Sequence, residues 1–210
     1  MKIIDIKKKI QEEFLPLVPK GYSFKKSKCE LVKESDGFNQ VFTIFCHNKG
    51  GWVQVHSEVR FQVPLVMKVY NQIFDCDFAV SEVLFGFETK IEGSKRYYAI
   101  QTEEELDGLA EMLKVDFDHF VEPLFDKCHN IKSLAKHMIK GAQKDGWSFT
   151  GSTTFSLSVL MILAWSQQLG YDIFIDIAKG CYIENEKKME EIEKVESFLK
   201  NIDLNFLDRL

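Results

Sequence analysis

The chain has 210 residues and a mass of 24.4 kDa, with 45% apolar residues, 28% charged residues and a formal net charge of −5. This composition is typical of a soluble globular protein and excludes the disordered, collagen-like and low-complexity classes. A chain of this length buries enough surface to fold without disulfides or a structural metal. Charge is unevenly distributed, because residues 1–70 hold 12 Lys/Arg against 7 Asp/Glu, whereas residues 71–210 hold 15 against 25.

The basic first third suits an acidic partner or nucleic acid. Its lysines are not interleaved with a recognisable nucleic-acid-binding motif, however. We therefore interpret them as solubilising residues on a helix and a sheet edge. Nucleic acid is not the partner that we expect.

The N-terminus and the cysteines indicate the compartment. Charged residues interrupt the apolar ones throughout residues 1–9, so the hydrophobic region of a signal peptide is missing there. The cysteines are odd in number, far apart and without a CxxC pair: Cys29, Cys46, Cys76, Cys128 and Cys181. We predict reduced thiols and a cytoplasmic location.

An uncharged segment between Asp145 and Asp172 is the one place where a membrane span has to be considered. Its purely apolar run, residues 159–165, is far shorter than the roughly 20 residues that a bilayer requires. The sequence therefore predicts a buried helix and no membrane partner.

The first predicted element is a helix over residues 3–17, where apolar residues recur at steps of three and four. Its inward stripe would consist of Ile3, Ile6, Ile10, Phe14 and Leu17. Pro16 and Pro19 are expected to end it.

Four extended segments follow, at residues 22–26, 29–33, 39–47 and 52–63. Turn residues separate the later ones, and such short connections make neighbouring strands antiparallel.

The fourth segment is the clearest strand, because apolar and polar residues alternate along it. One side, interrupted only by Ser57, carries Val53, Val55, Val59, Phe61 and Val63. The other side carries Trp52, Gln54, His56, Glu58, Arg60 and Gln62. We expect the first side to pack on a core and the second to be polar, as in an antiparallel sheet with one covered face. Pro64 should end the strand.

Helical periodicity takes over after one more predicted hairpin. Residues 65–76 fit a short helix, and residues 83–89 and 96–100 fit a hairpin closed around residues 92–94. Thr102 and Glu105 form a capping box before a long apolar stripe that Pro123 should kink. Further helices are predicted at residues 131–140, 154–169 and 172–179, and from Asn185 onward.

The order of these elements predicts the fold class. Strands come first and helices last, which favours α+β over a wound parallel sheet. We predict a single domain over residues 1–210, mainly sheet over 1–100 and helical over 101–210. Its antiparallel sheet of four to six strands would be covered on one face by the N-terminal helix and part of a C-terminal helical layer. Asn130 should cap the helix that Gly141 ends, and Gly170 should end the next one.

Three local patterns stand out between residues 1 and 140: a glycine-aromatic-lysine start, an aromatic strand that leads into the capping box, and a proline-aromatic helix. They are Gly21-Tyr22-Ser23-Phe24-Lys25-Lys26, Arg96-Tyr97-Tyr98-Ala99-Ile100 with Thr102-Glu103-Glu104-Glu105-Leu106, and Pro123-Leu124-Phe125-Asp126-Lys127. With them the chain resembles an uncharacterised bacterial family, of the domain of unknown function 4304 type. The resemblance implies a cytoplasmic α+β protein without an established activity, and it assigns no catalytic residue.

Cofactor and metal motifs are missing from the sequence. GxGxxG and GxxxxGK[ST] loops do not occur, and Gly50-Gly51 lies in a predicted hairpin turn. The histidines include no HExxH or other zinc spacing. We therefore expect no cofactor and no metal site.

His56, Glu58 and Arg60 form the most suggestive cluster, because alternate strand residues project from the same face about 7 Å apart. A general acid–base pair with an anion-holding arginine could be made from them. The alternative is a solvated face whose charges pair with neighbours.

Trp52 on that face, with Trp147 and Phe149 of the 146–151 loop, forms a second candidate set. These aromatic residues are either a binding patch or residues buried beneath the C-terminal helices.

The leading hypothesis is a non-enzymatic cytoplasmic binding protein with an unidentified protein partner. Its binding residues would be Trp52, His56, Glu58, Arg60 and Trp147. Size and acidity also suit an immunity-type inhibitor of a toxin, by analogy at the level of the fold class. The alternative is a small hydrolase or ligand-binding enzyme with His56, Glu58 and Arg60 as catalytic residues. A concave pocket at these residues would favour the enzyme, and an open patch the binding protein.

Overall fold

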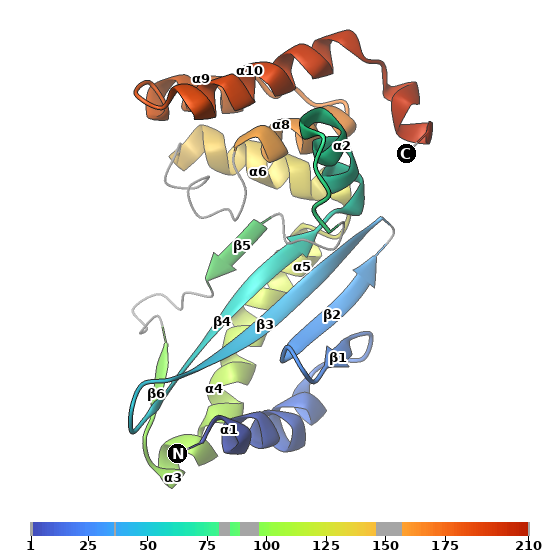
Figure 1. The fold of residues 1–210 in the computed structure, drawn as a ribbon. Coiled ribbons are helices and arrows are strands. Elements are labelled where there is room, and N and C mark those ends of the chain that lie inside the picture. Colours follow the sequence, from blue (N-terminus) through green and yellow to red (C-terminus); the bar gives the residue numbers. More distant parts are fainter. Residues whose placement is uncertain (1, 36, 80–84, 89–96, 146–156, 210) are drawn as a thin grey trace. The chain divides into compact units, whose positions relative to one another are not determined.

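The computed structural model describes residues 2–35, 37–79, 85–88, 97–145 and 157–209 of the chain (Figure 1). They form an α+β fold with an N-terminal helix, an antiparallel sheet and a C-terminal helical region, as predicted. The chain divides into two compact units. Unit 1 consists of Met1–Glu34, Asn39–Arg60 and Phe87–Asp126, and unit 2 of Ser35–Phe38, Phe61–Gly86 and Lys127–Leu210. Each unit takes segments from both sides of residue 100.

The described strands form one sheet. They are β1 (Ser23–Lys25), β2 (Glu30–Ser35), β3 (Phe38–Asn48), β4 (Val53–Gln62), β5 (Phe85–Glu88) and β6 (Tyr98–Ile100). They lie in the order β1-β2-β3-β4-β5, and β6 also pairs with β4. Because β3 occupies one edge of β4, β5 and β6 share the other edge, one beyond the other (Figure 1). In the antiparallel β4–β6 ladder, Val53 pairs with Ile100 and Val55 with Tyr98.

The four strands predicted between residues 22 and 63 are confirmed, each within two residues at either end. The predicted hairpin between residues 83–89 and 96–100 is wrong, because β5 and β6 each pair with β4. The ten residues of β4 provide an edge that accommodates both short strands. The expected turn at residues 92–94 lies outside the described residues.

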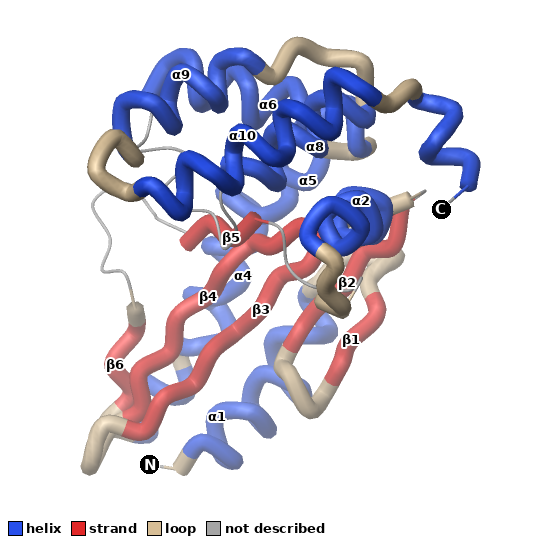
Figure 2. The backbone as a smooth tube through the Cα atoms, turned by 45° about the horizontal axis from the view of Figure 1, so that its top comes forward, coloured by secondary structure: helices blue, strands red, loops and turns tan. Residues whose placement is uncertain are grey.

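The helices of unit 1 lie before β1 and after β6. They are α1 (Ile3–Lys9), the π-helical turn η1 (Ile10–Phe14), the 3₁₀ turn η2 (Leu15–Leu17), α3 (Glu103–Asp107), α4 (Leu109–Asp116), the π-helical turn η3 (Phe117–Val121) and α5 (Glu122–Lys127). Figure 2 shows α1 and α4 on the same side of the β3–β4 hairpin. These helices cover one face of the sheet.

Three phenylalanines form the centre of the unit 1 core. The ring of Phe14 lies 6.2 Å from that of Phe42 in β3 and 6.3 Å from that of Phe117, and Phe42 and Phe117 are 5.6 Å apart. These edge-on and tilted contacts suit the quadrupoles of the rings. The buried amide of Gln40 adds a polar link, since its Nε2 donates to the Phe125 carbonyl at 2.7 Å.

The predicted N-terminal stripe is confirmed for Ile6, Ile10 and Phe14, which are fully buried. It is wrong for Leu17, which is 40% exposed. The reason is the change of helix type, since the wider π turn at Ile10–Phe14 and the 3₁₀ turn after it rotate the last residues away from the inward stripe.

The capping box is confirmed. The Glu105 amide donates to Thr102 Oγ1 at 3.2 Å, and the Thr102 amide donates to Glu105 Oε2 at 3.1 Å. The expected disturbance near Pro123 takes the form of the π turn η3 directly before α5. This agrees with proline's missing N–H, which removes a helical hydrogen bond.

Unit 2 is mainly helical. Its helices are α2 (Pro64–Phe74), α6 (Ile131–Asp145), α8 (Leu157–Ser166), α9 (Asp172–Cys181), α10 (Glu186–Asn201) and the 3₁₀ turn η4 (Leu204–Arg209). All residues of α8 from Leu157 to Ala164 are buried, because α8 contacts α2, α6, α9 and α10. A helix that is apolar on every side needs such neighbours. No helix in the described ranges is long and apolar enough to cross a membrane.

Two predicted helix ends in unit 2 are wrong. Gly141 does not stop α6, which continues to Asp145 because Ala142 extends its buried stripe. The next helix ends at Ser166 rather than near Gly170, and Gln168 adopts the left-handed conformation with φ of 56°. The predicted cap at Asn130 is confirmed, since its Oδ1 accepts from the Ser133 amide at 2.8 Å.

Candidate functional site: the polar face of the sheet

The alternation predicted for β4 is confirmed by burial. Val53, Val55, Val59 and Phe61 are at most 1% exposed, and Ser57 on the same side is 4% exposed. The side chains of His56, Glu58 and Arg60 on the other side are 20%, 25% and 24% exposed. This side is therefore neither an open surface nor a buried core.

Residues from three parts of unit 1 meet on this side. We call the set the polar face: Phe45, His47, Trp52, His56, Glu58, Arg60 and Tyr97. Phe45 and His47 come from β3, and His56, Glu58 and Arg60 come from β4. Trp52 and Tyr97 directly precede β4 and β6.

The β3–β4 turn places the first of these residues. Gly50 and Gly51 have φ of 70° and 119°, values that glycine adopts without steric strain. The Lys49 amide donates to the Trp52 carbonyl at 2.9 Å, and Asn48 Oδ1 accepts from the Gly50 amide at 3.0 Å. The closed turn brings the end of β3 beside the start of β4.

Three rings stack across the two strands. The His56 ring is 4.9 Å from that of Phe45 and 5.2 Å from that of His47, with interplanar angles of 16° and 12°. Phe45 and His47 are themselves 6.2 Å apart and almost parallel. Near-parallel rings at these separations contribute more than their burial alone, so the three side chains hold one another in place.

Charged groups lie beside the Phe45 and His56 rings. The Arg60 guanidinium lies over the Phe45 ring, with Cζ 4.6 Å from the ring centroid. Arg60 Nε also donates to Glu58 Oε2 at 3.1 Å. His56 Nε2 lies 3.8 Å from Glu58 Oε1, which is too far for a hydrogen bond but close enough for attraction when the imidazole is protonated. Glu58 thus lies between the Arg60 guanidinium and the His56 imidazole.

The second aromatic contact joins Trp52 to Tyr97, whose rings are 5.9 Å apart at 28°. Tyr97 is 39% exposed. The antiparallel β4–β6 ladder brings the two residues together. The polar face therefore has an exposed aromatic edge beside its stacked imidazoles.

The structure places four of the five predicted binding residues on one side of the sheet: Trp52, His56, Glu58 and Arg60. The fifth, Trp147, lies outside the described residues, as does Phe149. Sequence reasoning missed Phe45, His47 and Tyr97. Counting back from the predicted turn would have found Phe45 and His47, whereas Tyr97 depends on a pairing between segments about 45 residues apart and left no local signal.

The contacts of Glu58 and the position of Ser57 bear on whether the polar face could catalyse a reaction. The Glu58 carboxylate is engaged by Arg60, whose Nε donates to Oε2 at 3.1 Å. Ser57, the nearest hydroxyl in the strand, lies on the opposite, buried side. Among the described residues, no group of three His, Cys, Asp or Glu side chains is arranged to hold a metal ion.

A buried carboxylate of unit 1 with a raised pKa lies elsewhere. Asp116 is 3% exposed, and burial raises its pKa to about 6, although a hydrogen bond from Tyr98 at 2.8 Å opposes this shift. Tyr98 pairs with Val55, which places Asp116 on the helix-covered side of the sheet. Asp116 is therefore part of the core and separate from the polar face.

We compared the chain with known proteins and found no relative. No family model, no curated protein and no solved structure matches this chain. The resemblance to the 4304-type domain stays a prediction.

Proposed function

We propose that the protein is a non-enzymatic binding protein whose polar face contacts a protein partner. The observation that carries this proposal is the cluster of near-parallel Phe45, His47 and His56 rings, with the Arg60 guanidinium over the Phe45 ring. Aromatic residues and arginine are the residue types that dominate binding energy at interfaces. An array already fixed by its own contacts loses little side-chain entropy on binding.

The same contacts favour binding over hydrolysis. A general base needs an acceptor atom directed at the substrate, yet Glu58 Oε2 already accepts from Arg60 Nε at 3.1 Å. Partly exposed rings with paired charges suit a contact surface instead. We retain the hydrolase as the alternative, since His56, Glu58 and Arg60 do lie side by side.

The proposal extends to the class of partner and the compartment. The small size, the net charge of −5 and the α+β class are those of an immunity-type inhibitor, which would make the partner a toxin. The absence of a disulfide pattern supports a cytoplasmic location.

Affinity capture from native extract with the full chain as bait tests the proposal. We expect one protein to be retained by the wild type and reduced roughly tenfold or more with Tyr97→Ala or Arg60→Gln, because interface anchors cost at least about 1.4 kcal/mol when truncated. Ile4→Ala is the matched control, since Ile4 is an exposed apolar residue of unit 1 in α1.

The outcome distinguishes the two functions. Equal capture by the wild type and by both polar-face variants would contradict the binding proposal. Conversion of a metabolite in the same extract that His56→Ala abolishes, with capture unaffected, would establish the enzyme.

A further inference from the structure

Unit 2 contains a groove between α2 and α10. Its cavity has a volume of about 470 Å³ and is lined by Ile73, Lys194, Ser197, Phe198, Asn201 and Ile202. Ligand sites for small molecules fall between about 300 and 1,000 Å³. The groove is therefore large enough for a small organic molecule.

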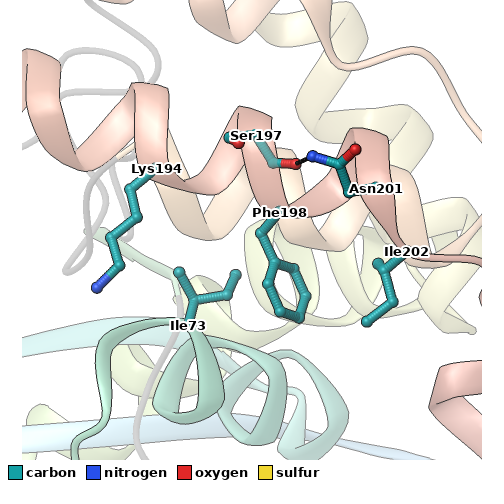
Figure 3. Close-up of a pocket in the computed structure, with 6 residues that line it drawn as sticks. All are labelled: Ile73, Lys194, Ser197, Phe198, Asn201 and Ile202. Atoms are coloured by element: carbon teal, nitrogen blue, oxygen red, sulfur yellow. Dashed lines mark hydrogen bonds between the residues drawn. The ribbon is translucent and has the colours of Figure 1, made fainter.

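The floor of the groove is apolar. Figure 3 shows Phe198 pointing from α10 toward α2, between Ile73 and Ile202. An edge-on contact with Phe206 of η4, at 5.6 Å, fixes the Phe198 ring from another side. The amide of Asn201 is engaged at the α10 backbone, since its Nδ2 donates to the Ser197 carbonyl at 2.8 Å. Polar groups thus stay at the rim, and hydrocarbon lines the interior.

A single lysine supplies the charge of the groove. Lys194 Nζ lies 5.0 Å from the centroid of the Phe74 ring, which holds the ammonium at one end of the groove. Among the described residues, no carboxylate forms an ion pair with Lys194, whereas Lys188 and Lys200 on the same helix pair with Glu191 and Glu196. Lys194 is thus the lining group that an anion would meet.

The helix dipole orients such an anion. Ile202 lies at the C-terminal end of α10, where the backbone carbonyls carry partial negative charge and disfavour an anion. Lys194 lies eight residues earlier, about 12 Å along the helix. The charged head of a ligand therefore belongs at Lys194 and its apolar tail toward Ile202.

From this asymmetry we infer that the groove binds a single-chain amphiphile with a carboxylate head, such as a medium-chain fatty acid. The carboxylate contacts the Lys194 ammonium, and the alkyl chain covers Ile73, Phe198 and Ile202. The site belongs to unit 2 and does not depend on the function of the polar face.

Calorimetric titration of the full chain with decanoate and with decanol, both below the concentration at which they aggregate, tests this inference. We expect saturable binding of decanoate and weaker binding of decanol. Lys194→Gln should weaken decanoate binding by up to about fivefold, the upper value for one exposed ion pair, and leave decanol binding unchanged. Ile202→Asp, which places a carboxylate where the alkyl chain of decanoate should lie, should abolish decanoate binding.

The matched control is Lys200→Gln, because Lys200 is an exposed lysine of α10 that pairs with Glu196 and does not line the groove. Isoleucine methyl resonances give a readout that requires no substitution, since decanoate should shift those of Ile73 and Ile202 and leave those of Ile6 and Ile10 in unit 1. No saturable binding, equal affinity for decanol, an equal effect of both lysine variants, or shifts confined to unit 1 would each overturn the inference.

Discussion

Asp116 shows how a single residue makes stability depend on pH. Its Oδ2 accepts from the Tyr98 hydroxyl, while its Oδ1 is buried without a hydrogen-bond partner among the described residues. Burial raises its pKa from 3.8 to about 6. Between about pH 4 and pH 6, the Asp116 carboxyl is therefore protonated in the native state, whereas in the unfolded state it has released its proton. This group favours folding below about pH 4, and its contribution is lost as the pH rises through 6.

We accordingly predict that Asp116→Asn stabilises the protein at pH 8. Asparagine still accepts from Tyr98 but carries no buried charge, so the gain should be about 1–3 kcal/mol, given 1.36 kcal/mol for each pKa unit. Urea unfolding at pH 8 and pH 4.5 measures it, and the difference from the wild type should shrink at the lower pH. Equal destabilisation at both values would show that the carboxylate is not the cause.

The cysteines give a second prediction at the scale of the residue. Burial raises the pKa of Cys29 to about 11 and that of Cys46 and Cys128 to about 12, which keeps these thiols unreactive. In the native protein we expect a thiol reagent to label the exposed Cys181 first and these three only after unfolding. The unfolded, unreduced protein should titrate five thiols. A count of three or one would reveal disulfides and contradict the proposed cytoplasmic location.

At the scale of the element, α8 is the core of unit 2. Leu160 is fully buried, so Leu160→Ala should lower the free energy of unfolding by roughly 2–5 kcal/mol through lost burial and a residual cavity. Leu17→Ala is the matched control: Leu17 is 40% exposed, and its truncation should cost at most about 1 kcal/mol. Denaturation midpoints compare the two, and similar losses would mean that α8 is not the core helix.

The capping box is an element that sequence alone predicted, because its hydrogen bonds join residues three apart. Thr102→Ala should cost about 1 kcal/mol by leaving the Glu105 amide without its cap, and Thr102→Ser should restore most of this loss. Chemical denaturation of the two variants and the wild type measures both values. No recovery with serine would indicate that the methyl group of Thr102, rather than its hydroxyl, stabilises α3.

An element could be predicted from the sequence where its contacts are local, and could not where they join distant segments. Strand β4 and helix α10 were found because one short segment contains their whole periodicity. The partners of β5 and β6 were not, since both depend on the distant edge of β4. The end of α6 was misplaced because burial of Ala142 outweighs the small helix preference lost at Gly141.

At the scale of the whole molecule, the sequence indicated the α+β class and the polar side of β4. Unit 1 joins its three segments through contacts such as Phe14 with Phe117, about one hundred residues apart. Three of the seven polar-face residues were likewise missed, because Phe45, His47 and Tyr97 come to lie beside residues 52–60 only when β3 and β6 pair with β4. Alternation identifies which side a residue faces, and only pairing identifies its neighbours.

The central claim is that the polar face binds a partner and is not required for folding. The dissociation constant of the captured partner for Arg60→Gln, measured by calorimetry beside the free energy of unfolding of the same variant, tests this claim most directly. We predict a loss of binding of at least tenfold with a change in unfolding free energy of about 1 kcal/mol or less. Unchanged affinity together with a loss of several kcal/mol in stability would contradict the account and make Arg60 a structural residue.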